Sequence, residues 1–358
     1  MEVMEMWLRM RMVSHLSAVK AVPIIERLLQ TRHVNHAVMK DCGLSPSQCT
    51  QFLKASPSVL VSSLNWLEQQ GNYLLTFSHP AYPALLKQIY SPPLVLFVSG
   101  DLTTLSEKQV AMVGSRSASF YGEKWGKTFA GGLAENGMVI TSGLAIGIDG
   151  FCHQAAVDAG GKTVAVLGSG LKNIYPSRHQ NLAHRIKENG ALISEFFPDT
   201  PPKAKNFLRR NRIISGLSLA LIIVEAHQNS GSLITARCAL EQGRDIFALP
   251  GPLGVNSNEG NHWLIKQGAY LATNVMDVME HIQTNFQWVN LEKEDNKQFE
   301  QTELPFADVL VNVSDEITPV DIIAQRSSLP ITEVMTQLLE LELMGKVAVV
   351  AGGYVRVN

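Results

Sequence analysis

Short apolar runs without polar alternation recur through the middle of the chain and alternate with stretches of helical periodicity. The runs cover residues 110–113, 138–141, 163–167, 191–194, 219–224 and 245–249. Helical stretches between them span residues 122–136, 150–159 and 179–189. Strands that are apolar on both faces and separated by helices indicate a parallel sheet with helices on both sides. The pattern therefore predicts an extended, Rossmann-like, doubly wound α/β fold, with ligands bound at the carboxyl ends of the strands.

The segment before this core, residues 1–75, has the apolar spacing of short helices. Ser45 stands before a proline at a predicted helix start, which is typical of an N-cap residue. One apolar face of a predicted helix contains Ile24, Ile25, Leu28 and Leu29. We interpret residues 1–75 as a small helical domain that precedes a core at residues 80–272.

The segment after the core divides into two parts. Residues 275–305 are rich in Asn, Gln, Glu and Lys, and we interpret them as a linker. Residues 306–358 read as two helices followed by a hairpin, which indicates a winged-helix module. The apolar face of the second helix contains Val334, Leu338, Leu341 and Leu343. Because the segment is acidic, we favour a protein contact or a regulatory role for it over duplex binding.

Charge is distributed unevenly, although the formal net charge of the 358 residues is only −2. Residues 1–107 carry a net charge of +1, residues 108–272 carry +6, and residues 273–358 carry −9. The middle segment therefore has the basic balance of a protein that binds a polyanion.

Targeting signals and metal-binding spacing are both missing from the sequence. No run of about 18 apolar residues predicts a membrane span, and the acidic N-terminus does not resemble a signal peptide. The four cysteines have neither CxxC pairing nor metal-site spacing. We therefore expect a cytoplasmic protein with reduced thiols, no bound metal, no cofactor and no membrane contact.

Small residues occur in the loops after four of the predicted strands and would gather at one edge of the sheet. They are Gly114-Ser115, Ser142-Gly143, Gly168-Ser169-Gly170 and Ser230-Gly231-Ser232. Loops of this kind point backbone N–H groups at anions and let a sugar-phosphate backbone approach closely. Neither G-x-G-x-x-G after the first strand nor G-x-x-x-x-G-K-[ST] is present, so dinucleotide binding and P-loop hydrolysis are not supported. A nucleotide and a nucleic acid both remain possible ligands at this point.

Basic side chains accompany these loops. Residues 201–212 contain five cations and no acidic residue: Lys203, Lys205, Arg209, Arg210 and Arg212. Phe207 lies among them, and an aromatic ring among cations suits stacking on a base. Arg116 follows the first strand, where a guanidinium can reach a phosphate across the crevice.

Acidic residues near the strand ends offer a competing interpretation. Asp149 and His153 are four residues apart on a predicted helix and would suit acid–base chemistry or metal binding. With no nucleophile or third partner nearby, we favour a structural role, in which Asp149 braces the crevice and His153 is a satisfied, partly buried side chain. Glu195 and Glu225 also follow strands, and we expect them to be ion-pair partners that orient arginines.

Several motifs, in order and spacing, resemble the DNA-processing protein A family (DprA, also called Smf). The most specific are VAMVGSRSASFYG, ITSGLAIGIDGFCHQAAVDAGGKTVAVLGSG, FLRRNRIISGLS and VEAHQNSGSLITARCALEQGRDIFALPG. The resemblance covers about residues 80–272, with weaker likeness to a helical SAM-like domain before it and a winged helix after it. It implies a bacterial cytoplasmic protein that binds and protects incoming single-stranded DNA in natural transformation, helps load the RecA recombinase, and has no established enzymatic activity.

The resemblance also implies particular contact residues. Phosphate-contacting positions of the family correspond to Gly114, Ser115 and Arg116, and to Arg210-Asn211-Arg212. Some members have a lysine three residues before the phenylalanine, where this chain has Ala204 between Lys203 and Lys205, so the lysine that contacts DNA is not fixed. The family's core forms dimers through its last segment, here 262–265 and Leu271, so we expect a homodimer that uses His262 and Leu271.

An enzyme of a different class remains the alternative. Phosphoribohydrolases that act on nucleotides share a related fold and carry a P-G-G-x-G-T-x-x-E run. This chain instead has Leu-Pro-Gly-Pro-Leu-Gly at residues 249–254, without the following Thr and Glu. The difference favours a DNA-binding protein, which we do not expect to be an enzyme.

Overall fold

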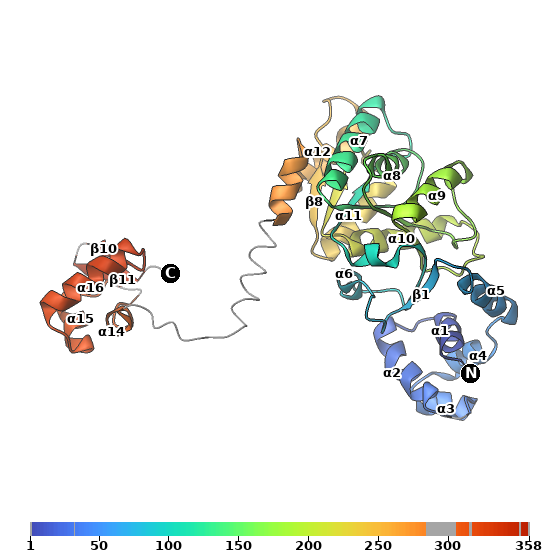
Figure 1. Cartoon of the computed structure of the whole chain (residues 1–358), viewed down its shortest axis with the longest axis horizontal. Helices are drawn as coiled ribbons and strands as arrows, with labels where there is room; N and C mark the ends of the chain where they lie inside the picture. The colour runs from blue at the N-terminus through green and yellow to red at the C-terminus, as the bar shows by residue number, and fades with distance from the viewer. Residues whose placement is uncertain (1, 32, 284–305, 315–316, 351, 357–358) are drawn as a thin grey trace. The chain divides into compact units, whose positions relative to one another are not determined.

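The computed structural model describes residues 2–31, 33–283, 306–314, 317–350 and 352–356 (Figure 1). The chain forms two compact units, Met1–Asn285 and Phe286–Asn358, and each is described by itself. Among the described residues, no helix has the length and apolar character needed to span a membrane.

A sheet of nine described strands forms the centre of the first unit, in the order β1-β2-β6-β5-β4-β3-β7-β8-β9. Strands β3 to β9 pair in parallel, whereas β1 pairs antiparallel with β2, and β2 with β6. Their bounds are β1 Asn72–Thr76, β2 Val95–Gly100, β3 Gln109–Val113, β4 Val139–Ser142, β5 Thr163–Val166, β6 Ala191–Ser194, β7 Ala220–Ile223, β8 Asp245–Ala248 and β9 Tyr270–Leu271. Because β3, β4, β5 and β6 are buried at every position, they carry the unalternated apolar runs of the sequence.

Helices cover both faces of this sheet, which confirms the predicted doubly wound fold. The chain passes from β3 to β6 in one direction and from β7 to β9 in the other, so right-handed crossovers place the two sets of helices on opposite faces. One face carries α7 Phe120–Glu135, α8 Ile148–Asp158 and α9 Gln180–Asn189. The other carries α10 Ala204–Leu217 and α11 Gly231–Glu241, and the short helices α6 Ala84–Lys87 and α12 Glu259–Lys266 complete the core.

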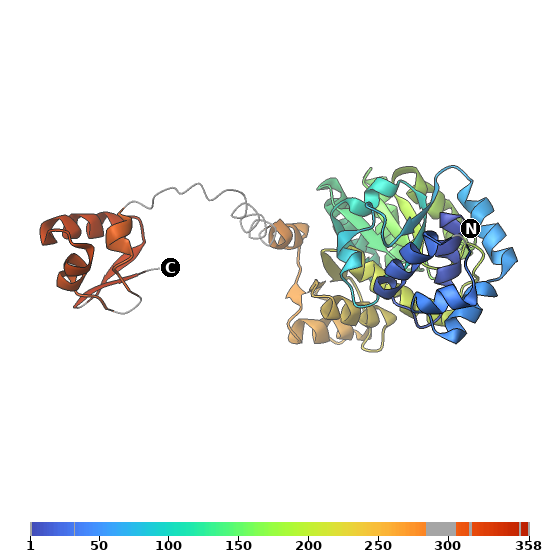
Figure 2. The same ribbon diagram turned by 90° about the horizontal axis from the view of Figure 1, so that it is seen from below.

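Five helices precede the sheet and gather against its β1–β2 end (Figures 1 and 2). They are α1 Val3–Arg11, α2 Ala18–Leu29, α3 His36–Asp41, α4 Pro46–Leu53 and α5 Pro57–Leu67. Ser45 caps α4 as predicted, through a reciprocal capping box with Gln48. The predicted apolar face is correct for Ile24, Ile25 and Leu28, but wrong for Leu29, which ends α2 and is exposed.

Three sheet strands were missed by the sequence analysis: β1, β2 and the two-residue strand β9. Residues 72–76 were assigned to the helical segment, but they form β1, so the predicted boundary at residue 75 lies inside a strand. Only Leu75 of β1 is buried, because β1 lies at the edge of the sheet, and five residues with one buried position give no clear period. Strand β2, buried at every position but Gly100, lies before the first predicted apolar run, where no element was expected.

The start of the predicted linker is also helical, over residues 275–283. Asn274 accepts a hydrogen bond from the Asp277 N–H, and the Asp277 carboxylate accepts from Thr273 and Asn274, which caps the first turn. Val278 and Ile282 are buried on one face of this helix and stabilise it by packing. Residues 284–305, the rest of the predicted linker, lie outside the described residues.

The second unit is a winged-helix module, as predicted. Three helices, α14 Ala307–Leu310, α15 Val320–Ser327 and α16 Ile331–Leu343, pack together beside a hairpin of β10 Val347–Val350 and β11 Gly353–Arg356. Val334, Leu338 and Leu341 are buried as predicted, whereas Leu343, at the end of α16, is exposed. The prediction of two helices missed α14, which is only four residues long.

A buried histidine joins α8 to the sheet. His153 is fully buried, and its Nδ1 lies 2.6 Å from Thr163 Oγ1. Because the Thr163 hydroxyl donates its proton to the Ile140 carbonyl, Nδ1 of His153 is the donor to Thr163. Burial, reinforced by the charges of His179 and Arg210, lowers the pKa of His153 to about 3. His153 is therefore a neutral imidazole in the folded protein.

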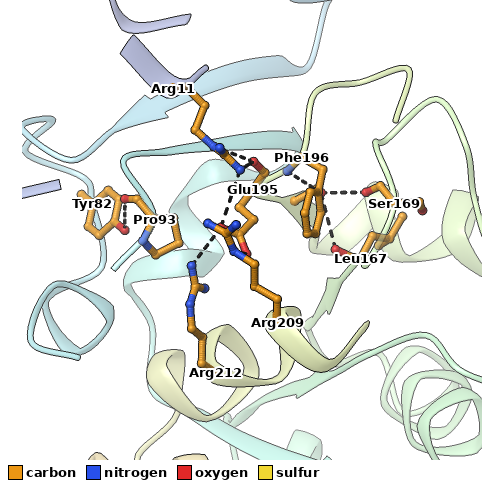
Figure 3. A network of polar contacts seen from close by, with 10 residues as sticks. Arg11, Tyr82, Pro93, Leu167, Ser169, Glu195, Phe196, Arg209 and Arg212 are labelled. Atoms are coloured by element: carbon orange, nitrogen blue, oxygen red, sulfur yellow. Dashed lines mark hydrogen bonds and ion pairs between the residues drawn. The ribbon is translucent and has the colours of Figure 1, made fainter. Parts of the chain in front are cut away.

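A buried carboxylate joins the N-terminal helices to the core (Figure 3). Glu195 directly follows β6 and is almost completely buried, with Arg212 Nη2 at 2.8 Å and Arg209 Nε at 3.1 Å from its carboxylate oxygens. Arg11, at the end of α1, donates two hydrogen bonds to the Glu195 carbonyl oxygen, at 3.1 and 3.2 Å. Glu195 therefore holds one face of α10 and the end of α1 against the end of β6. This agrees with the prediction that Glu195 forms ion pairs with arginine.

Replacing Glu195 with Gln removes the only carboxylate shown to pair with these three guanidinium groups in the described structure. Leaving buried charges unpaired costs about 3–5 kcal/mol, and we expect a loss of this order in the free energy of unfolding, measured with urea. Arg209→Ala serves as the control, because Arg209 is half exposed and its removal should cost only about 0–1 kcal/mol. Equal stability of Glu195→Gln and the unchanged protein would contradict this account.

His153 predicts a particular dependence of stability on pH. Its folded pKa of about 3 lies below the unfolded value near 6.5, so the unfolded chain binds a proton that the folded chain does not. Above pH ~6.5 the protonation of His153 therefore does not affect the free energy of unfolding. Below that pH the free energy of unfolding decreases, by about 2 kcal/mol at pH ~5. Urea unfolding of His153→Asn, which keeps a donor toward Thr163, should lack this decline. A variant with the same pH dependence as the unchanged protein would show that His153 does not carry it.

Candidate nucleic-acid interface

The carboxyl ends of β3 and β7 lie side by side, although the chain leaves them in opposite directions along the sheet. Such a switch point leaves a crevice between the two following loops. A pocket of about 810 Å³ occurs here. Nine of the residues predicted to bind DNA line it: Gly114, Ser115, Arg116, Phe207, Arg210, Asn211, Ser230, Gly231 and Ser232.

The loop after β3 packs too closely for any side chain at Gly114. A Cβ atom there would lie 2.6 Å from Ile148 Cγ1 and 2.9 Å from the Glu225 carbonyl oxygen. Ser115 is buried, its N–H donates to the Glu225 carbonyl at 2.7 Å, and its hydroxyl accepts from the Ser117 N–H at 3.1 Å. The loop is therefore held rigidly against the end of β7, and Arg116 beyond it is exposed at the pocket.

Arg210 is the most unusual group of the pocket, because its guanidinium is almost fully buried. Its Nη1 donates to the Val166 carbonyl at 2.6 Å, at the end of β5. Gly143 provides the space, since a Cβ atom there would lie 1.8 Å from Nη1. Burial lowers the pKa of Arg210 to about 10, partly offset by the negative charge of Asp149. A guanidinium with pKa near 10 still carries its positive charge at neutral pH.

Asp149 braces this arrangement, as predicted. Its carboxylate accepts hydrogen bonds from the backbone N–H groups of Gly143 at 3.1 Å and Ala145 at 3.4 Å, and so fixes the loop after β4. Burial raises the pKa of Asp149, while the charge of Arg210 and the two backbone hydrogen bonds oppose that rise. Asp149 thus serves as a counter-charge in the floor of the pocket.

Phe207 lies between the cations and next to a second aromatic ring. The guanidinium carbons of Arg116 and Arg210 are 5.8 and 6.0 Å from the centre of its ring, within the range of cation–π contact. The Tyr175 ring centre lies 5.5 Å away, and both rings line the pocket. Two adjacent aromatic faces beside two guanidinium groups suit the stacking of bases and the binding of phosphate.

The loop after β7 forms the opposite wall. Ser230 is the N-cap of α11, and its hydroxyl accepts the N–H of Ser232 at 3.3 Å. The following first turn of the helix directs its remaining N–H groups toward the pocket end, where anions are favoured. The hydroxyl groups of Ser230 and Ser232 and the N–H of Gly231 therefore add neutral donors to the charge of the arginines, because the N–H groups of Ser230 and Ser232 are already bonded within the loop.

Three predicted residues lie elsewhere. Lys203 and Lys205 are exposed at the start of α10 and do not line the pocket, although Ala204 between them does. Arg212 lies on the opposite side of α10 from the pocket, in the ion pair with Glu195. The sequence analysis did not predict α10 as a helix, so its basic residues were interpreted as a single patch. In the structure, the 3.6-residue period of the helix places Arg210 and Arg212 on different faces.

Tyr175 is one of the pocket residues that the sequence analysis missed, and His227 and Leu208 are others. The sequence gave little indication of a role for Tyr175. It lies in the irregular segment between β5 and α9, where no helical or strand periodicity shows which way a side chain points. Only the Tyr-Pro pair after a glycine-rich strand end marked it as a turn residue.

The carboxylates give no evidence of an assembled catalytic site. His153 is bound to Thr163, and it is fully rather than partly buried, with Nε2 lacking a hydrogen-bond partner among the described residues. The expectation that Glu225 orients an arginine is wrong, because its carboxylate accepts the Ser119 N–H at 2.9 Å, at the start of α7. No cluster of three metal-ligating side chains occurs within the part of the chain that the structure describes.

The predicted dimer residues lie at the other end of the sheet. Leu271 belongs to β9, the last strand in the order, and is half exposed, as are Trp263 and Tyr270 nearby. His262 Nε2 lies 3.0 Å from the Gly251 carbonyl, which holds its ring in place. The predicted apolar patch near the last edge is therefore present, except that Leu264 is buried in the core.

Comparison with known proteins agrees with this architecture across the whole chain. Residues 73–283 match the family described as DNA recombination-mediator protein A, residues 1–65 the SMF/DprA SAM domain, and residues 299–353 the DprA winged helix domain. Protein Smf of Escherichia coli is 48% identical over 358 residues, which cover 99% of this chain and 96% of that protein.

Two solved structures share the fold. DNA processing protein A from Streptococcus pneumoniae superposes with a TM-score of 0.68 and 34% identity, covering 78% of this chain and 98% of the other. DNA processing protein A from Helicobacter pylori, whose structure concerns its binding of single-stranded DNA, gives a TM-score of 0.55 and 30% identity, covering 61% and 98%. The chain therefore belongs to the DNA-processing protein A (DprA/Smf) family.

Proposed function

We propose that this protein is a recombination mediator that binds single-stranded DNA in the pocket at the β3–β7 switch point. The observation that carries the proposal is the buried, charged Arg210 beside the aromatic pair of exposed Tyr175 and half-buried Phe207. Phosphates would lie against Arg116, Arg210 and the N–H groups of the loops, while bases stack on the rings. The binding of single-stranded DNA by the Helicobacter pylori relative supports this ligand.

We further propose that the protein protects incoming DNA in natural transformation and helps load the RecA recombinase onto it. Family membership supports these roles. A DNA strand that is held only at the pocket leaves its other nucleotides accessible to a second protein. Catalysis is not part of the proposal, because the pocket offers binding groups without an activated nucleophile.

We propose that two copies associate through the β9 edge, using His262 and Leu271. Exposed apolar side chains beside an edge strand favour a symmetric contact between identical surfaces. A dimer presents two pockets to one strand and so raises its affinity through effective concentration.

The ligand proposal is tested by titrating fluorescent single-stranded and duplex DNA of equal length. Single strands should bind far more tightly, because stacking on Tyr175 and Phe207 needs unpaired bases, and affinity should fall steeply with salt. Equal affinity for the two ligands would refute the proposed mode of binding.

The acidic C-terminal module is proposed to contact a protein or regulate the pocket. A truncated protein that ends at Thr284 is therefore titrated with the same two DNA ligands. Because the removed residues 285–358 carry a net charge of −7, their loss should leave the affinity for single strands unchanged or higher. If the shortened chain folds but loses most of its affinity, the winged helix itself reads DNA.

Arg116→Ala should weaken binding of single strands by about 1–3 kcal/mol, the scale of one charge-assisted contact, without changing the urea midpoint. Arg116→Lys should restore only part of the loss, because Lys lacks the bidentate fork. Arg27→Ala, which removes an exposed arginine from α2, is the matched control. If the Arg116 and Arg27 variants bind alike, Arg116 is not a DNA contact.

Leu271→Arg should convert a dimer to a monomer in light scattering at micromolar concentration, because it places two charges at the centre of the proposed contact. Val61→Arg, at an exposed apolar position on α5, should leave the assembly unchanged. A monomeric parent protein, or a dimeric Leu271→Arg variant, would show that β9 is not the interface.

A further inference from the structure

A second polar groove, of about 550 Å³, lies between the N-terminal helices and α9. Its floor is formed by neighbouring residues on three strands, because Ser99 of β2 pairs with Asn72 of β1 and with Leu192 of β6. One wall comes from the end of α5 and the following turn, and the other from one face of α9. Wall residues are Trp66, Gln69, Gln70, Gln180, Asn181, Ala183, His184 and Lys187.

The chemistry of this groove is that of a surface for a polar, negatively charged chain. Among the described residues that line it there is no Asp or Glu, but there are two lysines, Lys172 and Lys187, and His184. Side-chain amides from Gln69, Gln70, Asn72, Gln180 and Asn181 provide donors and acceptors. Amides bind phosphate, sugar and base edges alike, and the lysines neutralise phosphate.

A single loop connects this groove to the pocket at the switch point. Leu171, Lys172 and Ile174 line the groove, whereas Tyr175, the next residue, lines the pocket. Tyr175 is three positions after Lys172, a separation of at most about 11 Å between their Cα atoms, so the two cavities flank the same short segment. Lys172 is anchored to the N-terminal helices, with its Nζ 2.8 Å from Ser62 Oγ and 3.0 Å from Asp199 Oδ1.

We propose that the groove is a second subsite for the same nucleic-acid strand, which passes from the pocket over Tyr175 and continues between α5 and α9. The proposal rests on the proposed function and extends it by naming where the strand leaves the pocket. Pockets of about 300–1,000 Å³ each hold a small ligand, so one cavity accommodates only a short stretch of strand. The described lining residues include no Asp or Glu, but the charge of Lys172 is already offset by Asp199, so the attraction of the following phosphates depends mainly on Lys187.

The groove also gives the N-terminal helices a direct part in binding. Gln69 and Gln70, in the turn after α5, are exposed and reach the DNA strand only if these helices stay docked, and buried Trp66 at the end of α5 packs against Phe97 of β2. Asn72 donates to the Trp66 carbonyl at 2.8 Å, which joins the wall to the floor. Long strands thus contact two structural layers, whereas short strands contact the core alone.

The test compares the full-length protein with a double variant, Gln180→Glu and Lys187→Glu, on strands of two lengths. A strand of about six nucleotides fills the pocket alone, and one of about 20 nucleotides reaches the groove. The double variant should bind the long strand roughly tenfold more weakly and the short strand as tightly as before. Its salt slope on the long strand should be shallower by about 0.7 for each phosphate that the variant no longer neutralises.

A matched control changes the same residue types on the outer N-terminal helices, with Gln30→Glu and Lys40→Glu, which are both exposed. This control should bind both strands normally. Unchanged affinity of the groove variant for the long strand, or an equal loss on both strands, overturns the proposal. The groove variant would also keep its affinity for the long strand if long strands bind more tightly only because they bridge two copies of the protein. If the unchanged protein binds neither strand, the proposed function itself fails.

Discussion

The site depends on the burial of one guanidinium group. Arg210 reaches through the niche left by Gly143 to the carbonyl at the end of β5, and Asp149 beneath it supplies the opposing charge. Burying a charge is expensive unless hydrogen bonds or an opposite charge offset it, and here the Val166 carbonyl and the charge of Asp149 do so, while Nε of Arg210 has no hydrogen-bond partner among the described residues. A fixed cation at the floor of a pocket binds phosphate without first losing the rotamer entropy of an exposed side chain. The glycine-rich strand ends are therefore needed to admit Arg210 as much as to admit a ligand.

Helix α10 connects this site to the rest of the molecule through its two faces. Phe207 and Arg210 face the pocket, whereas Arg209 and Arg212 pair with Glu195, which also binds Arg11 of α1. Motion of the N-terminal helices is thus coupled to the position of α10 through one buried carboxylate (Figure 3). Because α1 packs against α5, the same contact also supports the wall of the groove that α5 forms.

The fold was predictable because its central strands are buried on both faces and carry unbroken apolar runs. Glycine-rich strand ends and Arg116 were predictable for a related reason, since the ends of parallel strands must meet at one edge. Prediction failed where the local pattern is short or mixed, as in the five-residue edge strand β1 and the segment around Tyr175. It also grouped Arg212 with Arg210, because only the helical period of α10 shows that they face opposite ways. Glu195 was correctly expected to bind arginine, but its third partner, Arg11, lies 184 residues away and gives no sequence signal.

The most direct measurement of the central claim is photo-crosslinking of a single strand that carries a photoreactive thymidine analogue, followed by peptide mapping. If bases stack on the aromatic pair beside Arg210, the crosslinks will fall on Tyr175 and Phe207, and an excess of unlabelled single strand will abolish them. Crosslinks confined to the winged-helix module, with none on the peptides that contain Tyr175 and Phe207, would contradict the account.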